Sequence, residues 1–102
     1  MKAHLELGYV RAAHGLKGEV NVRTFDPASE TLYEVERVLA RRRDGAEVEL
    51  PVEAVREAPK GDLLVAFGGV ATREQAEGFV GATLLAFRED LEAPAEGEYF
   101  QG

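Results

Sequence analysis

The stretch from residue 8 to residue 22 constrains the fold most, because a short glycine-containing segment lies there between two runs of alternating apolar residues. Apolar side chains stand two apart on either side of that segment, at Leu5, Leu7 and Tyr9 before it and at Val20 and Val22 after it. This period of two is typical of half-buried β-strands. The segment itself, His14–Gly18, contains Gly15 and Gly18, which accept backbone angles that other residues resist. The sequence therefore predicts two strands joined by a connection of fixed shape.

Three basic side chains, Arg11, His14 and Lys17, fall within a span of seven residues at this connection. Loops that a sheet holds rigidly often carry function. Two interpretations stay open: either the glycines shape a tight corner and the basic side chains are merely solvated, or Arg11, His14 and Lys17 contact a phosphate or a carboxylate of a partner. Four glycines are expected to have structural roles in either case: Gly8, Gly15, Gly18 and, later in the chain, Gly81.

The size and charge of the chain limit what it can do. A chain of 102 residues forms one domain at most, with too small a core to surround a deep catalytic cleft. The net charge of −7 argues against bulk attraction to nucleic acid. Residues 1–60 hold ten Lys or Arg against eleven Asp or Glu, whereas residues 61–102 hold two against eight. The acidic second part suits a basic protein partner, and any phosphate contact must come from local clusters in the first part.

The residue types that are missing exclude several classes of site. Cysteine is absent, so the chain has no disulfide, thiol nucleophile or cysteine metal ligand. The two histidines stand ten apart, and no serine or threonine lies in a nucleophile-elbow or phosphate-loop context. We therefore predict no catalysis, no metal and no cofactor. No apolar run approaches the roughly 20 residues that span a bilayer, and a signal peptide is not recognisable, so we expect a cytoplasmic monomer without membrane contact.

The remaining elements predict an all-β fold. Further strands are expected at 20–25, 37–43, 47–53, 63–67 and 83–87. Asp44-Gly45 is a strong hairpin signal, and Pro51 indicates an edge or a bulge. Residues 29–35 allow either a single helical turn or an irregular crossing. Because small turns join six mostly antiparallel strands, a closed barrel is favoured over an open sheet, since closure removes exposed edges.

One short helix is expected near residues 72–80. Thr72 and Gln75 have the spacing of a capping box, in which each side chain bonds a backbone amide of the first turn. Ala76, Phe79 and Val80 would form the buried stripe, and Gly81 would end the helix in the left-handed conformation.

Two further segments carry candidate partner-binding residues. Arg41 and Arg43 lie beside the Asp44-Gly45 turn, where they are either solvated or in contact with the phosphates of a nucleic acid. Residues 88–102 are acidic and aperiodic, which predicts a linker that ends in the aromatic pair Tyr99 and Phe100. This pair could pack on the barrel, pack on a further domain, or anchor a basic protein.

The residues resemble the RimM family of ribosome maturation factors along the whole chain. Four motifs carry the resemblance in order: 13–20 (AHGLKGEV), 67–77 (FGGVATREQAE), 81–88 (GATLLAFR) and 96–99 (EGEY). The resemblance implies a six-stranded closed Greek-key barrel like those of translation factors. It also implies a non-enzymatic factor that assists late assembly of the small (30S) ribosomal subunit head and processing of its rRNA, and that binds ribosomal protein S nineteen. Direct contact with rRNA is a further possibility of this resemblance. The alternative is a general RNA-binding barrel of the translation-factor kind.

The end of the chain departs from the family pattern. Family members continue into a second, PRC-type barrel, whereas this sequence stops at Gln101-Gly102. Either the chain is a fragment, which we favour, or residues 99–102 come partly from an expression tag. We expect residues 1–87 to form the N-terminal barrel and residues 88–102 to form the acidic linker and the truncated start of the second barrel.

Overall fold

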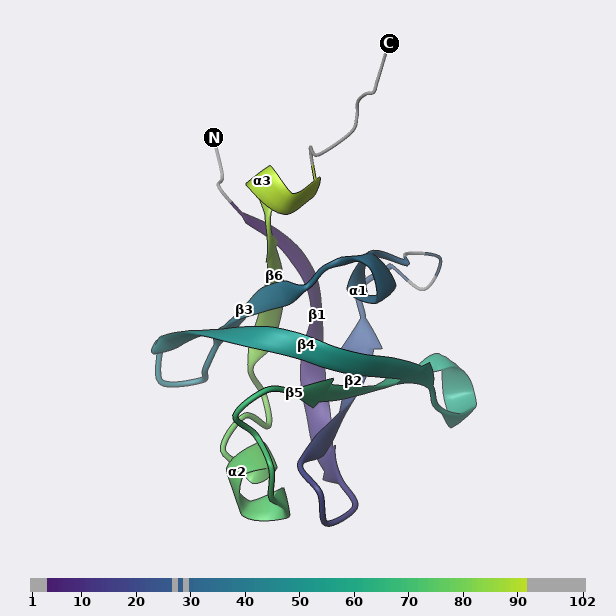
Figure 1. Cartoon of the computed structure of the whole chain (residues 1–102), viewed down its shortest axis with the longest axis vertical. Helices are drawn as coiled ribbons and strands as arrows, with labels where there is room; N and C mark the ends of the chain where they lie inside the picture. Colours follow the sequence, from purple (N-terminus) through teal and green to yellow (C-terminus); the bar gives the residue numbers. More distant parts are fainter. Residues whose placement is uncertain (1–3, 27, 29, 92–102) are drawn as a thin grey trace, which may run out of the picture.

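Six antiparallel strands close into a barrel in the computed structural model, which describes residues 4–26, 28 and 30–91. Around the barrel the strands follow the order β1-β2-β5-β4-β3-β6, as the ribbon in Figure 1 shows. The strands are β1 (His4–His14), β2 (Glu19–Thr24), β3 (Arg37–Arg41), β4 (Glu47–Glu57), β5 (Leu63–Phe67) and β6 (Thr83–Phe87). The helical segments are α1 (Thr31–Glu34), the 3-10 turn η1 (Pro59–Gly61), α2 (Arg73–Glu77) and α3 (Arg88–Leu91). The predicted six-stranded closed barrel is therefore confirmed.

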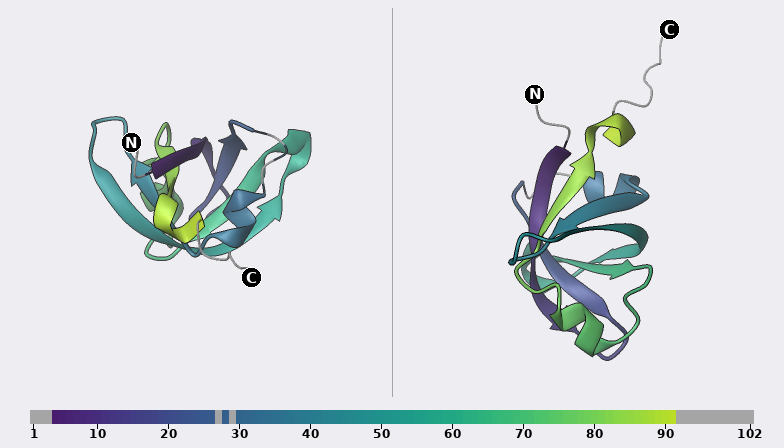
Figure 2. Two further views of the ribbon diagram at one scale, coloured as in Figure 1. Left: turned by 90° about the horizontal axis from the view of Figure 1, so that it is seen from above. Right: turned by 90° about the vertical axis from the view of Figure 1, so that its left-hand side faces the viewer.

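The alternation of apolar residues fills the barrel as expected. The most deeply buried side chains point inward from five strands: Val10, Val20, Val22, Val38, Val65, Phe67 and Leu84. Leu39 faces the other side of β3 and pairs with Leu85 of β6, where both are still buried. The right-hand view of Figure 2 shows α3 (yellow-green) at the upper end of the barrel and α2 (green) at the lower end.

The two longest strands, β1 and β4, contain the irregularities of the sheet. The ladder of β1 shifts register between Glu6 and Gly8 and again after Val10, and the ladder of β4 shifts after Val52. Such bulges bend a strand so that its two halves can follow different partners. Pro51 therefore lies next to a bulge and not at an edge, and β4 continues past the predicted limit at residue 53.

The ambiguous region at 29–35 contains one helical turn, α1. Leu32 and Val35 anchor it, at 2% and 8% exposure. Of the two structures that the sequence left open, the helical turn is confirmed.

Helix α2 is capped as predicted but is shorter. The Thr72 hydroxyl accepts a hydrogen bond from the amide of Gln75 (3.2 Å), and the side-chain oxygen Oε1 of Gln75 accepts one from the amide of Ala71, the residue before the cap (2.7 Å). The helix ends at Glu77, and tighter bonds to the third preceding residue continue the chain through Phe79 and Val80. Those tighter turns separate the helix from Gly81, which has the expected positive φ of +89°.

Two other predicted boundaries are wrong. Strand β3 ends at Arg41, because the amide of Arg42 already bonds the carbonyl of Ala46 across the Asp44-Gly45 turn (2.7 Å). Residues 88–91, expected to belong to an aperiodic linker, form the helical turn α3. Ion pairs to β3, described below, hold this turn against the barrel.

The connection between β1 and β2 depends on two glycines with positive φ, Gly15 at +68° and Gly18 at +90°. They differ in their surroundings. A Cβ on Gly15 would have no neighbour within 4 Å, whereas a Cβ on Gly18 would collide with the backbone carbonyl of Val70. The corner is therefore wedged against the segment that follows β5.

Alanine at these two glycines should separate backbone strain from steric collision. We expect Gly15→Ala to lower the free energy of unfolding by about 1 kcal/mol, the cost of a left-handed residue with a side chain. Gly18→Ala should cost roughly 1–3 kcal/mol more, because the carbonyl of Val70 must move as well. Urea unfolding of both variants measures the difference. Equal losses of unfolding free energy would show that the contact between Gly18 and Val70 does not constrain the corner.

Candidate functional site

The corner between β1 and β2 presents exposed side chains on a frame that is held in place. His14, Leu16 and Lys17 are all exposed, and Leu16 is 81% accessible. Arg73 of α2 donates a hydrogen bond from Nη1 to the carbonyl oxygen of Gly15 (3.1 Å). Among the described residues, neither the side chain of His14 nor that of Lys17 has a hydrogen bond or an ion pair. The structure thus brings Arg73 beside this corner, which no local feature of the sequence indicated.

Arg11 lies within β1 and not on the connection, so it does not join His14 and Lys17. Its Nη1 donates to Oδ2 of Asp62, and Arg23 Nε donates to Oδ1 of the same carboxylate (3.1 Å). Asp62 is only 3% exposed, while the two arginine side chains are 41% and 48% exposed. A buried carboxylate thus holds two arginines at the barrel surface. No local feature of the sequence indicated this pairing.

The charge state of Asp62 follows from opposing effects. Burial by itself would raise the pKa of Asp62, but the hydrogen bonds from Arg11 and Arg23 outweigh it, so the pKa lies below its usual value. The carboxylate is therefore ionised at neutral pH.

The arginines near the hairpin do not form a common surface. Arg41 Nε pairs with Glu47 Oε2 (3.1 Å), and the Arg42 guanidinium lies 5.4 Å from the ring centre of Phe79. The side chain of Arg43 passes over Gly81, whose positive φ of +89° favours glycine at this position. Tyr99 and Phe100 are outside the described residues.

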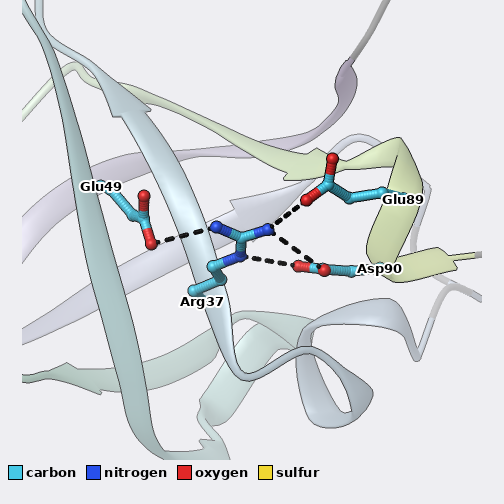
Figure 3. A network of polar contacts seen from close by, with 4 residues as sticks. All are labelled: Arg37, Glu49, Glu89 and Asp90. Carbon is cyan, nitrogen blue, oxygen red and sulfur yellow. Dashed lines mark hydrogen bonds and ion pairs between the residues drawn. The ribbon is translucent and has the colours of Figure 1, made fainter.

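Arg37 binds three carboxylates at the end of the barrel where α3 lies (Figure 3). Its Nη1 pairs with Glu49 (3.2 Å), its Nη2 with Glu89 (2.8 Å) and its Nε with Asp90 (3.1 Å). The guanidinium also lies 4.0 Å from the ring centre of Phe87. Hydrogen bonds, first to Asp90 and then to Glu49, raise the pKa of Arg37 further above its ordinary value. This Arg37 cluster ties α3 to β3 and β4.

The rest of the described chain offers no other obvious chemistry. Within residues 4–26, 28 and 30–91, no three His, Asp or Glu side chains gather as a metal ligand set. No helix in the same part of the chain is both long and apolar enough to cross a bilayer.

Comparison with known proteins agrees with this architecture. The family model described as the RimM N-terminal domain matches residues 5–91. The chain belongs to the RimM family. A ribosome maturation factor RimM from Myxococcus xanthus is 58% identical over 99 residues, which cover 97% of this chain and 52% of that protein. One from Anaeromyxobacter is 42% identical over 100 residues, covering 96% of this chain and 58% of the relative.

Solved RimM structures share the fold. The N-terminal domain of RimM from Thermus thermophilus has a TM-score of 0.74 and 27% identity, over 93% of this chain and all of that domain. A proposed 16S ribosomal RNA processing protein RimM from Pseudomonas aeruginosa has a TM-score of 0.72 and 26% identity, over 95% of this chain and 55% of the other. The chain therefore spans about half the length of the full RimM proteins it matches.

Removal of the buried charge should make stability less dependent on pH. Because the pKa of Asp62 is lowered by folding, its stabilisation is present above about pH 4 and is lost as the pH falls through the folded value. We expect Asp62→Asn to lower the free energy of unfolding at pH 7 by about 1–2 kcal/mol, since two charged hydrogen bonds to half-exposed arginines are weakened. Urea unfolding at neutral and at acidic pH measures the difference.

The control for this change is Glu47→Gln, which breaks the exposed Arg41 pair and should cost less than about 0.5 kcal/mol at either pH. A deficit in Asp62→Asn that stays constant down to about pH 2 would show that the carboxylate charge is not what stabilises the fold.

Loss of Arg37 should release α3. We expect Arg37→Ala to speed amide hydrogen exchange in residues 88–91 by about fivefold, because the turn loses its ion pairs to β3. Arg37→Lys should give an exchange rate between those of the wild type and Arg37→Ala, since an ammonium cannot reproduce the fork of the guanidinium. Arg41→Ala, on the same strand, is the control and should leave these amides unchanged; the same exchange rate in both alanine variants would contradict the role of Arg37.

Proposed function

We propose that this chain contributes to maturation of the small (30S) ribosomal subunit, in late assembly of its head and in processing of its rRNA. In this proposal it acts in the cytoplasm as a monomer, binds ribosomal protein S nineteen on the immature head, and catalyses no reaction. The supporting observation is the match of residues 5–91 to the RimM N-terminal domain, which covers the whole barrel.

The names of the relatives agree with this role. The curated relatives are ribosome maturation factors, and the similar Pseudomonas structure is described as a 16S ribosomal RNA processing protein. Since the chain spans about half of those proteins, the proposal for this chain concerns the part played by the barrel.

The surface offers two kinds of contact. The corner presents the side chains of His14 and Lys17, which are unpaired within the described residues, and its glycine frame limits the entropy lost on binding. The net charge of −7 favours approach to a basic partner such as a ribosomal protein. Arg41, Arg43, Tyr99 and Phe100 remain proposed partner contacts, together with Arg11.

Co-sedimentation tests the proposal. The purified chain should sediment with free small subunits and not with joined ribosomes. Lys17→Gln should weaken this association about fivefold, the equivalent of one lost charge contact of about 1 kcal/mol. Lys60→Gln, which neutralises a lysine in η1, should have no effect.

Two outcomes would overturn this proposal in different ways. Equal binding to naked rRNA and to whole subunits in a filter assay would favour the general RNA-binding barrel instead. Failure of the chain to bind isolated ribosomal protein S nineteen while it still sediments with small subunits would move the protein contact away from residues 1–102.

A further inference from the structure

The outer face of β1 and β2 carries a group of four residues, Tyr9, Arg11, Arg23 and Phe25, that we call the arginine–aromatic face. Tyr9 and Arg23 are direct partners in the β1–β2 ladder, and their sequence neighbours Val10 and Val22 point into the core. Arg11 and Phe25 stand two residues further along each chain segment, beside this pair. Because the strands are antiparallel, these two residues lie on opposite sides of the pair: Arg11, at the β1 bulge, shares Asp62 with Arg23, and Phe25, just past the end of β2, lies beside the ring of Tyr9. Arg11 and Phe25 are both exposed, so the four residues border one outward surface.

The two arginines of this face are oriented before any partner arrives. Arg11 and Arg23 each donate one hydrogen bond to the buried carboxylate of Asp62, yet 41% and 48% of their side chains stay exposed. A guanidinium has five N–H donors, so most donors remain open on each arginine within the described chain. Two guanidiniums against one carboxylate leave one net positive charge, fixed in place on an otherwise acidic protein.

The aromatic half of the face is also accessible. Phe25 is 53% exposed, and its ring lies 6.1 Å from that of Tyr9 at an interplanar angle of 32°. Burial of this exposed ring against the flat face of a ligand would be favourable.

We infer that the arginine–aromatic face binds unpaired nucleotides of RNA, with Arg11 and Arg23 on a backbone phosphate and Phe25 stacked on a neighbouring base. Guanidinium forks match phosphate oxygens, and bases that are free of a duplex stack on aromatic rings. Glu30 and Glu57 line the pocket next to Asp62 and would repel the backbone on that side. The strand would therefore run from the arginines towards Phe25. This inference rests on the proposed ribosomal function and adds the class of ligand for one surface.

Binding of a short fluorescent oligouridylate to the intact chain, followed by anisotropy at several salt concentrations, tests the inference. Arg23→Gln should weaken binding and reduce the salt slope by about 0.7, the value for one phosphate contact on a single strand. Phe25→Ala should weaken binding about tenfold and leave the salt slope unchanged, because stacking releases no counterions. Duplex RNA of the same length should bind less well than the single strand.

Matched variants control for charge, exposure and folding. Arg56→Gln removes another exposed arginine that pairs with one carboxylate, Glu19, and Tyr33→Ala removes another exposed aromatic. Neither should change oligouridylate binding. Arg23→Lys keeps the charge but loses the planar fork, so it should keep the salt slope and still bind more weakly. Circular dichroism melting of each variant shows whether the fold is intact.

Three results would overturn the inference: no binding of oligouridylate by the wild type at low salt, equal losses in the test and control variants, or full competition by polyglutamate. If any of these occurs while the chain still sediments with small subunits, the RNA-binding face is wrong and the proposed function stands. If the oligouridylate results hold but sedimentation fails, the proposed function is wrong and the face is a general site for single-stranded RNA.

Discussion

Closure of the sheet by the ladder between β1 and β6 is the constraint on which the other features depend. The first and last strands of the barrel pair directly, from His4 with Phe87 to Tyr9 with Thr83. Without this ladder both strands would be open edges, and the inward valines would lose their partners on the far side. Closure needs β1 to serve two neighbours, and its two bulges make that possible. Arg11 lies at the second bulge, between Val10 and Ala12.

Carboxylates arrange several of the arginines of this acidic chain. Asp62 fixes Arg11 and Arg23 on the side of the barrel, and Arg37 is surrounded by Glu49, Glu89 and Asp90 at the end of α3. The charge balance of the two groups is opposite. The first holds one carboxylate and two guanidiniums, and the second holds three carboxylates and one guanidinium. The first can therefore attract an anion, whereas the second uses up its cation within the fold. A net charge taken over the whole chain hides this difference.

Local patterns predicted the barrel well because strands, turns and caps are local in sequence. The alternation of valines gave the inward faces, Asp44-Gly45 gave the hairpin, and Thr72 with Gln75 gave the start of α2. The errors fell at element ends, where β4 runs on past a bulge and where residues 88–91 coil into α3. The ion pairs could not be predicted, since Arg11 and Asp62 are 51 residues apart and Arg37 and Asp90 are 53 apart. Which charged residues meet across such distances depends on the register of the closed sheet. The partner-binding roles of His14, Lys17, Arg41 and Arg43 stay predictions.

The contact between Gly18 and Val70 has a consequence for the order of events during synthesis. The β1–β2 corner is among the first parts of the chain to leave the ribosome, yet the backbone that wedges it and the arginine that bonds Gly15 belong to residues 70 and 73. The corner therefore reaches its final shape only after most of the barrel has been translated and has folded. A nascent or half-folded chain would lack a competent corner, so recognition through it would be reserved for finished molecules.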